Sequence, residues 1–229
     1  SYKAMSLALK DAVFELTENL RNSGKTRLSE CIEQNWEKSA VSYSRDLNTY
    51  QPHRPMEPEM LRAFELELER LDTSDTERST ILKSLNKRRV LQTAPHLGAT
   101  ESPRMLCINW LGSLGVPEDG YYVVGMFSGI PFSNNSRPGR IIMKTNGVNL
   151  FPSTMQDGLV YRSLIPEKLL EVTASLPEEM KKYLPETTVG ESYTKWALIT
   201  CQQIERTVLR KNNLVYVDIN EVVTNYLIQ

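Results

Sequence analysis

Hydrophobic residues change their spacing at Arg89, and this change constrains the fold more than any other feature of the sequence. Before Arg89, apolar residues recur every three or four positions, as they do in amphipathic helices. After Arg89, short β-branched runs alternate with helical stretches, which is typical of strands separated by helices. We therefore predict a helical N-terminal region over residues 1–88 and an α/β domain over residues 89–229. The clearest helical stripe comprises Met5, Leu9, Ala12, Leu16 and Leu20.

The sheet is predicted from three apolar runs. Residues 90–93 and 121–127 read as strands on either side of a helix over residues 103–114, which favours a right-handed βαβ unit. A third buried strand is predicted over residues 214–217, and Asn220 is predicted to cap a short final helix. We therefore expect a Rossmann-like, mostly parallel sheet with flanking helices. Because doubly wound sheets usually continue past such a strand, a missing C-terminal half is an open alternative.

Several side chains carry predictions about burial. Trp196 belongs to an aromatic stripe on one face of a helix over residues 191–210, which favours core packing over a cofactor site. Cys31 and Cys201 lie beside apolar neighbours, so both are predicted to be buried as small hydrophobic residues. On a helix over residues 60–71, the acidic residues are predicted to form a solvated face; they are Glu65, Glu67 and Glu69.

Composition excludes several classes of protein. The 229 residues include 27 Lys and Arg against 28 Asp and Glu, so no broad basic surface for nucleic acid is expected. No run approaches the ~20 consecutive apolar residues of a membrane helix, and the first residues do not resemble a signal peptide. Three widely spaced Cys and two His argue against a disulfide framework and a zinc site. We expect a cytoplasmic protein without a metal ion.

The junction over residues 93–103 is the first candidate site, because open α/β sheets bind ligands where strands end. The helix that follows presents unpaired N–H groups that attract anions, and glycine lets a ligand approach the backbone closely. Histidine and threonine add hydrogen-bond donors for a phosphate or carboxylate. A tight turn shaped by prolines and glycine is the structural alternative. The expected ligand-contacting residues are Thr93, His96, Gly98 and Thr100.

A second candidate loop, residues 128–140, leaves the neighbouring strand and should lie at the same edge of the sheet. Its guanidiniums suit recognition of a carboxylate or phosphate, and it contains no acid–base pair for proton transfer. An exposed loop of turn-forming residues is the alternative. Asp218 should reach this edge from the last strand, either to cap a helix or to bind a ribose. The residues predicted to bind here are Ser128, Gly129, Ser133, Asn134, Asn135, Arg137, Arg140 and Asp218.

Pro95-His96-Leu97-Gly98, between a strand and a helix, resembles the His-containing signature of class I aminoacyl-tRNA synthetases and related nucleotidyl transferases. The resemblance implies that His96 contacts ATP phosphates and that Gly98 makes room for adenine. The second synthetase signature, a Lys-rich loop, is not evident; Met143-Lys144-Thr145 is a poor substitute for it. The resemblance covers one four-residue piece.

The order of elements over residues 60–229 also resembles bacillithiol synthase, which belongs to the same nucleotide-binding superfamily. Thr93, Pro95-His96, Gly98 and Ser102-Pro103 stand where that family has a Thr, a pair of Gln, a Gly and a Gly-Pro. Where the family has an acidic, His-containing loop, this chain has residues 128–135, which contain neither an acidic residue nor a His. This difference argues against the reaction that the family catalyses. The resemblance implies a superfamily fold and a ligand site, with ATP as the cofactor.

These observations lead to one hypothesis about function and two alternatives. The hypothesis is a ligase- or transferase-like enzyme of amino-acid or amine conjugation that binds a nucleotide or another anionic small molecule at residues 93–102 and 128–140. His96 would be the catalytic residue that polarises a phosphate or carboxylate, and Arg137 or Arg140 would clamp a carboxylate.

The first alternative is a non-catalytic binding or assembly module whose N-terminal helices recruit a partner. An exposed apolar patch on the helix over residues 5–20 would support it. The second alternative is one half of a larger enzyme, completed by a second chain or a missing C-terminal half. Nucleic acid and membrane are not expected partners, although the synthetase resemblance leaves tRNA open.

Overall fold

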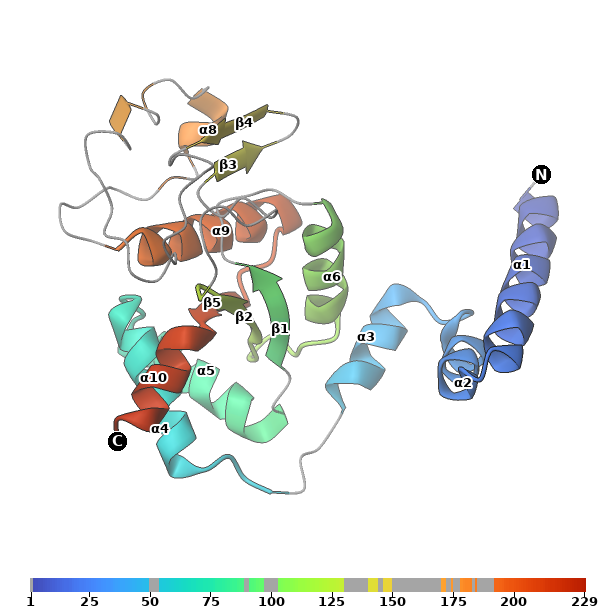
Figure 1. Cartoon of the computed structure of the whole chain (residues 1–229), viewed down its shortest axis with the longest axis horizontal. Helices are drawn as coiled ribbons and strands as arrows, with labels where there is room; N and C mark the ends of the chain where they lie inside the picture. The colour runs from blue at the N-terminus through green and yellow to red at the C-terminus, as the bar shows by residue number, and fades with distance from the viewer. Residues whose placement is uncertain are drawn as a thin grey trace. The chain divides into compact units, whose positions relative to one another are not determined.

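The computed structural model divides by its internal contacts into an N-terminal unit, Ser1–Tyr43, and a C-terminal unit, Ser44–Gln229. Figure 1 shows the elements of both units. The helices α4 and α5, which the sequence analysis placed in the N-terminal helical region, belong to the C-terminal unit. The structure describes residues 2–49, 54–88, 91–96, 103–129, 140–143, 146–149, 170–171, 174, 178–182, 184 and 192–229.

The N-terminal unit is a helical hairpin of α1 (Tyr2–Asn22) and α2 (Thr26–Asn35), followed by the start of α3 (Ala40–Asn48). Gly24 forms the turn in the left-handed conformation, φ 77°, which glycine adopts without strain. Ser29 Oγ on α2 donates to the Thr17 carbonyl on α1 at 2.8 Å, and both residues are buried. No hydrophobic side chain is buried among the described residues of this unit.

The C-terminal unit contains a parallel sheet in the order β1-β2-β5. Val123 of β2 lies opposite Leu91 of β1 and Val215 of β5. The parallel pairing of β1 and β2 on either side of α6 confirms the predicted strand–helix–strand sequence. The strands and the helix are β1 (Leu91–His96), α6 (Pro103–Leu114), β2 (Tyr122–Phe127) and β5 (Leu214–Asp218).

The predicted Rossmann-like sheet is wrong, because the described part of the chain is mainly helical and its parallel sheet has three short strands. These strands lie side by side in chain order, so their order never reverses and creates no switch-point crevice of the doubly wound kind. Two further strands do not join this sheet. β3 (Arg140–Met143) and β4 (Asn146–Asn149) pair antiparallel with each other.

One face of the sheet packs against α4 (Pro58–Arg70), α5 (Asp75–Arg88) and α10 (Ile219–Leu227). Pro58 is the first residue of α4. Proline is favourable there because a backbone N–H at this position would have no hydrogen-bond acceptor within the helix. Alternate residues of β2 and β5 point into this layer, as the two-residue period of strands requires. The buried core here comprises Ala63, Phe64, Leu68, Ile81, Leu85, Val123, Val215, Val217 and Val222.

The other face packs against α6 and α9 (Tyr193–Leu209). Trp196 is 1% exposed and stacks on Tyr193 with ring centroids 5.8 Å apart, so the prediction of an aromatic core stripe is confirmed. α6 lies so close to β2 that a Cβ on Gly112 would lie 2.3 Å from the Tyr122 ring. The short helix α8 (Glu178–Lys181) lies in a largely undescribed stretch.

The cysteines divide between surface and core. Cys201 on α9 is buried, as predicted. The prediction for Cys31 is wrong, because its side chain is exposed on a hairpin that buries no apolar residue in its described part. Cys107 on α6 is also exposed.

Candidate functional site

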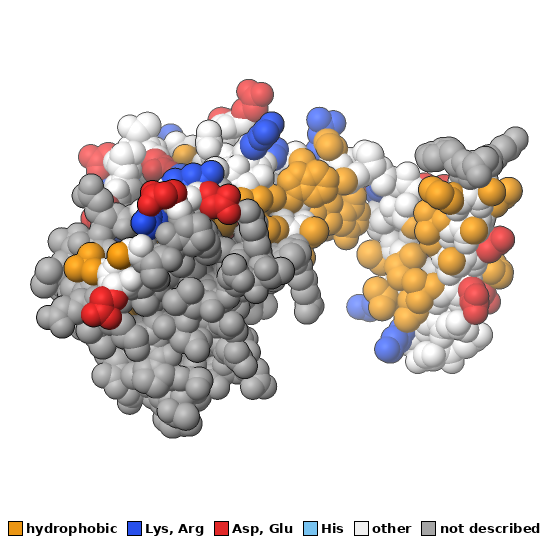
Figure 2. All heavy atoms as spheres, turned by 90° about the horizontal axis from the view of Figure 1, so that it is seen from above, with side chains coloured by type: hydrophobic (Ala, Val, Ile, Leu, Met, Phe, Trp, Pro, Cys, Tyr) orange, Lys and Arg blue, Asp and Glu red, His pale blue; other side chains and the backbone are white. Residues whose placement is uncertain are grey.

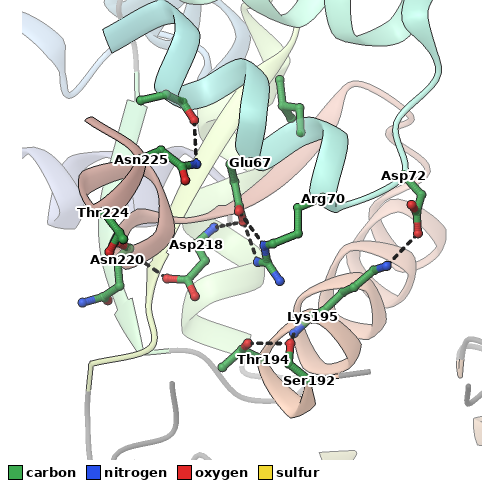
Figure 3. Close-up of polar contacts among 12 residues, drawn as sticks. Glu67, Arg70, Asp72, Ser192, Thr194, Lys195, Asp218, Asn220, Thr224 and Asn225 are labelled. Atoms are coloured by element: carbon green, nitrogen blue, oxygen red, sulfur yellow. Dashed lines mark hydrogen bonds and ion pairs between the residues drawn. The ribbon is translucent and has the colours of Figure 1, made fainter. Parts of the chain in front are cut away.

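Polar side chains from three elements meet at the carboxyl edge of the sheet (Figure 3). β2 ends at Phe127 and continues into Ser128, while β5 ends at Asp218 and leads directly into α10. The last turns of α4 bring Glu67 and Arg70 to the same place. Because parallel strands end at a common edge, this arrangement collects charged groups where α/β proteins often bind ligands.

Glu67 forms the fully buried centre of this cluster. Its Oε2 accepts from Arg70 Nε at 2.8 Å, and its Oε1 accepts from the second Arg70 nitrogen at 2.8 Å and from the Asp218 backbone N–H at 3.0 Å. Burial raises the pKa of Glu67, and the hydrogen bonds and charge of Arg70 oppose that rise. The bidentate pair therefore keeps a carboxylate inside the core and ties α4 to the end of β5.

Asp218 is also fully buried and caps the N-terminus of α10, since its Oδ1 accepts from the Asn220 N–H at 3.0 Å. Of the two roles left open for Asp218, the structure shows helix capping. The prediction that Asn220 caps this helix is wrong, because Asp218 occupies the N-cap position and Asn220 lies inside the helix. Burial raises the pKa of Asp218, while the nearby Ser128 hydroxyl opposes the rise. Asp218 Oδ2 and Ser128 Oγ form no hydrogen bond of regular geometry with the described residues, but the two groups are close enough for the Ser128 hydroxyl to stabilise the carboxylate.

Asn220 fixes the end of β2 against α10. Its Oδ1 accepts from the backbone N–H groups of Ser128 and Gly129, each at 3.0 Å. A Cβ on Gly129 would lie 2.7 Å from Asn220 Nδ2, so the close approach favours glycine. The two strand ends are therefore held rigidly, with Ser128 and Asp218 side by side.

A second buried polar group lies on the other face of the sheet, between α6 and α9. Asn109 Nδ2 donates to Glu205 Oε2 at 2.7 Å and to the Tyr216 hydroxyl at 2.8 Å. Burial raises the pKa of Glu205 to about 7, and the Asn109 hydrogen bond only partly opposes this. Glu205 therefore takes up or releases a proton near neutral pH inside the core.

The structure describes only part of the predicted site. Thr93 lies opposite Gly125 and His96 opposite Phe127 in β1, so the strand runs to His96 rather than ending at Thr93. Arg140, the last residue of the second candidate loop, begins β3 opposite Asn149 in a two-stranded hairpin. Ser128, Gly129 and Asp218 are brought together at the carboxyl edge. The predicted site residues outside the described residues are Gly98, Thr100, Ser133, Asn134, Asn135 and Arg137.

Sequence reasoning missed Glu67 and Arg70. The prediction that Glu67 lies on a solvated face is wrong, since its side chain is 0% exposed. The available signal was its position four residues after Ala63 and three after Phe64, both core residues. An Arg three residues further on was the second signal, because a buried carboxylate needs a charged partner.

Grooves on the described surface lie elsewhere. One runs between α4 and α5 and includes Leu61 and Leu82. Another lies at the amino end of β2, between Lys83, Lys87 and Asp119. Among the described residues, no group of His, Cys, Asp and Glu is arranged to hold a metal ion, and no helix is both long and apolar enough to cross a membrane.

Comparisons with protein-family models, with curated proteins and with solved structures found no match for this chain. Any proposal about function therefore depends on the chemistry of the described residues.

Proposed function

We propose that the chain binds a small molecule at the carboxyl edge of the sheet, through an amino or hydroxyl group that donates to Asp218 Oδ2. The supporting observation is that Asp218 Oδ2 and Ser128 Oγ are buried without a hydrogen bond of regular geometry to the described residues. Leaving one such atom unpaired costs about 1–3 kcal/mol, and more when it is charged. A hydroxyl or a neutral amine both donates and accepts, so one ligand atom would satisfy both side chains.

Arg70 supports an anionic group on the same molecule. Two of its nitrogens donate to Glu67, and its side chain is 27% exposed. A guanidinium has five N–H donors, which leaves donors for a second anion. The proposed ligand therefore carries a donor group and a carboxylate or phosphate.

Amine conjugation by a ligase- or transferase-like enzyme is the reaction that we propose for this site. A neutral amine hydrogen-bonded to Asp218 would attack the carbonyl carbon of an acyl phosphate or acyl adenylate made with ATP. The new C–N bond would form as the C–O bond breaks and phosphate or AMP leaves with that electron pair, and the carboxylate would accept the amine proton. Burial raises the pKa of Asp218, which makes its ionised form a stronger base. His96, the last residue of β1, stays the residue proposed to polarise a phosphate or carboxylate, and ATP stays the proposed cofactor.

The proposal is tested by thermal denaturation of the full chain with ATP, amino acids, simple amines and sugar phosphates. A ligand that binds the folded state raises the melting temperature, and the rise grows with the logarithm of the ligand concentration above its dissociation constant. We expect Asp218→Asn to abolish that rise, because Asn caps a helix as well as Asp does but lacks the charge. Ser128→Ala should weaken the response, and His96→Ala should weaken the response to phosphate ligands alone.

Asp72→Asn is the matched control, because the Asp72 side chain is 75% exposed and pairs with Lys195. It should respond to every ligand as the wild type does. If no compound raises the melting temperature, or if Asp218→Asn responds like Asp72→Asn, the proposed site does not exist.

A further inference from the structure

The helix α6 turns small and polar residues towards the sheet and α9. The fully buried residues of its described part are Asn109, Gly112 and Ser113, which lie three and four positions apart and share one face of the helix. Two large apolar side chains lie elsewhere, since Ile108 is 40% exposed and Trp110 is 41% exposed. Figure 2 shows hydrophobic side chains on the described surface in orange. On the α6 side, this contact therefore has no fully buried apolar residue among those described.

Asn109 makes the polar link between α6 and the elements beneath it. Its Nδ2 donates to Glu205 Oε2 of α9 at 2.7 Å and to the Tyr216 hydroxyl of β5 at 2.8 Å. Among the described residues, its buried Oδ1 has no hydrogen-bond partner. Such an acceptor destabilises a closed contact, and water would satisfy it on opening. The link between α6 and α9 is therefore incomplete.

The neighbours of Glu205 do not offset its charge. In the described part of the chain, the titratable groups beside it are Tyr216 of β5, Tyr122 of β2 and, one turn earlier on α9, Cys201. Burial and the Glu205 charge raise the pKa of Tyr122 to about 12. The described side chains of α6 are uncharged. None of these groups can carry a positive charge.

The basic residue next to Glu205 along α9 is engaged elsewhere. Arg206 Nε donates to the Leu214 carbonyl at 2.6 Å, and the same guanidinium pairs with Glu77 of α5 at 3.2 Å. No ion pair joins Glu205 to a described Lys or Arg. Burial accordingly raises the pKa of Glu205 to about 7, and the Asn109 hydrogen bond only partly opposes this.

The C-terminal end of α6 is fixed more firmly than the part before Asn109. The Gly115 N–H donates to Ser44 Oγ at 2.7 Å, and the Gly112 carbonyl accepts from Ser44 Oγ and from Asn48 Nδ2, each at 3.2 Å. These bonds attach α6 to α3 within the C-terminal unit. By contrast, none of residues 106–108 is fully buried. The contact with α3 can therefore serve as a hinge for α6.

We propose that α6 is a proton-controlled flap whose N-terminal half, hinged at its contact with α3, separates from α9 and β5 when Glu205 releases its proton and closes when Glu205 is protonated. This conformational device does not depend on the proposed small-molecule site, because Glu205, Asn109 and Tyr216 take no part in that site.

The direction of the response follows from proton linkage. In the closed state the Glu205 pKa is about 7, whereas in an open, hydrated state it returns to 4.5. Between these values, opening breaks the Glu205 O–H bond and passes the proton to water. Opening is therefore favoured as pH rises. For these two pKa values, its equilibrium constant should increase about tenfold from pH 6 to pH 8.

Native-state hydrogen exchange of the full chain tests this, with α6, β2 and β5 amides followed at pH 6 and pH 8 in several low urea concentrations. After correction for intrinsic rates, the protection of the α6 amides should fall about tenfold from pH 6 to pH 8. Because the flap exposes little surface, this exchange should depend on urea less than exchange in β2 and β5, which requires global unfolding.

Three variants assign the response to Glu205. Glu205→Gln cannot ionise, so its α6 protection should be the same at pH 6 and pH 8. Glu118→Gln, at an exposed position, is the control and should keep the wild-type response. Asn109→Leu removes the hydrogen bond that favours the charged form, so the fall in protection should move to higher pH. This variant provides a second test if Glu205→Gln does not fold.

Three results would overturn the flap. The first is α6 protection that does not change with pH in the wild type. The second is α6 exchange with the same urea dependence as β2 and β5, which would mean that α6 opens only when the whole unit unfolds. The third is a fall in protection that persists in Glu205→Gln or stays at the same pH in Asn109→Leu.

Discussion

The two units of this chain place polar and apolar groups in opposite ways. The C-terminal unit buries aliphatic residues and Trp196 on both faces of a three-stranded sheet, and it encloses three carboxylates among them: Glu67, Glu205 and Asp218. In the described part of the N-terminal unit the buried residues are two hydroxyl-bearing ones, Thr17 and Ser29, and the apolar residues are either partly buried or exposed. Folding of the C-terminal unit is therefore driven by a buried apolar core, whereas the described part of the N-terminal unit contains no fully buried apolar residue.

The largest expected effect is a core substitution in the C-terminal unit. Leu68 on α4 is 0% exposed, so Leu68→Ala removes apolar contacts and leaves a cavity. We expect a loss of about 3–4 kcal/mol in the free energy of unfolding, measured by urea denaturation followed through tryptophan fluorescence. Leu7→Ala on α1 is the comparison and should change stability by less than about 0.5 kcal/mol. Equal effects of the two substitutions would remove the contrast between the units.

The buried carboxylate Glu205 should make stability depend on pH. Its pKa rises from 4.5 to about 7 on folding, so the folded state holds a proton that the unfolded chain has released. The stability from that proton is complete below pH 4.5 and declines as pH rises towards 7. The loss is about 3 kcal/mol for a shift of this size.

Glu205→Gln should therefore unfold at a higher urea concentration than the wild type at pH 8, and the difference should disappear near pH 4. Glu118→Gln, at an exposed position, is the control and should follow the wild type at both pH values. The wild type should lose stability between pH 4.5 and 7. If Glu205→Gln loses the same amount over this range, a group other than Glu205 causes the loss.

The Glu67–Arg70 pair should have an intermediate effect. Arg70→Met leaves Glu67 fully buried with one remaining donor, the Asp218 N–H. We expect a loss of about 2 kcal/mol, below the value for a wholly buried pair because Arg70 is partly exposed. Arg62→Met on the exposed side of the same helix should cost less than about 0.5 kcal/mol.

A double substitution distinguishes an unpaired charge from lost packing. If the charge of Glu67 causes the loss, then Glu67→Gln combined with Arg70→Met should recover part of it. The Arg70→Met variant should also regain stability at acid pH, where Glu67 takes up a proton. A loss that is unchanged by pH and by Glu67→Gln would assign the role of Arg70 to packing alone.

The sequence predicted the ends of β2 and β5 because continuous β-branched runs mark buried strands, and it therefore placed Ser128 and Asp218 at one edge. It did not predict that β1 extends through Pro95. Proline has no N–H to donate, but β1 is the outermost strand of the sheet, where such a residue is tolerated.

The spacing of residues in the sequence could not predict how many strands the sheet contains or that the Glu67 carboxylate is buried. Short runs such as residues 140–143 favour a strand without specifying its partner, and here they form a hairpin of their own. Glu67 was assigned to solvent because an acidic residue is rarely buried, yet Arg70 and the Asp218 N–H satisfy it. The stripe on α1 was predicted as one face of a helix, and the sequence could not show that α2 buries only Thr17 of α1 in the described hairpin.

The smallest expected effect concerns the polar contact inside the N-terminal unit. Ser29→Ala removes the hydrogen bond to the Thr17 carbonyl, which holds α2 against α1. The loss of about 1 kcal/mol should speed hydrogen exchange of the α1 and α2 amides about fivefold without changing exchange in β2 or β5. Ser23→Ala is the matched control, because its hydroxyl bonds to the Asn19 carbonyl at an exposed position. If Ser29→Ala exchanges like Ser23→Ala, this hydrogen bond does not stabilise the hairpin, and the half-buried apolar side chains between α1 and α2 hold it instead.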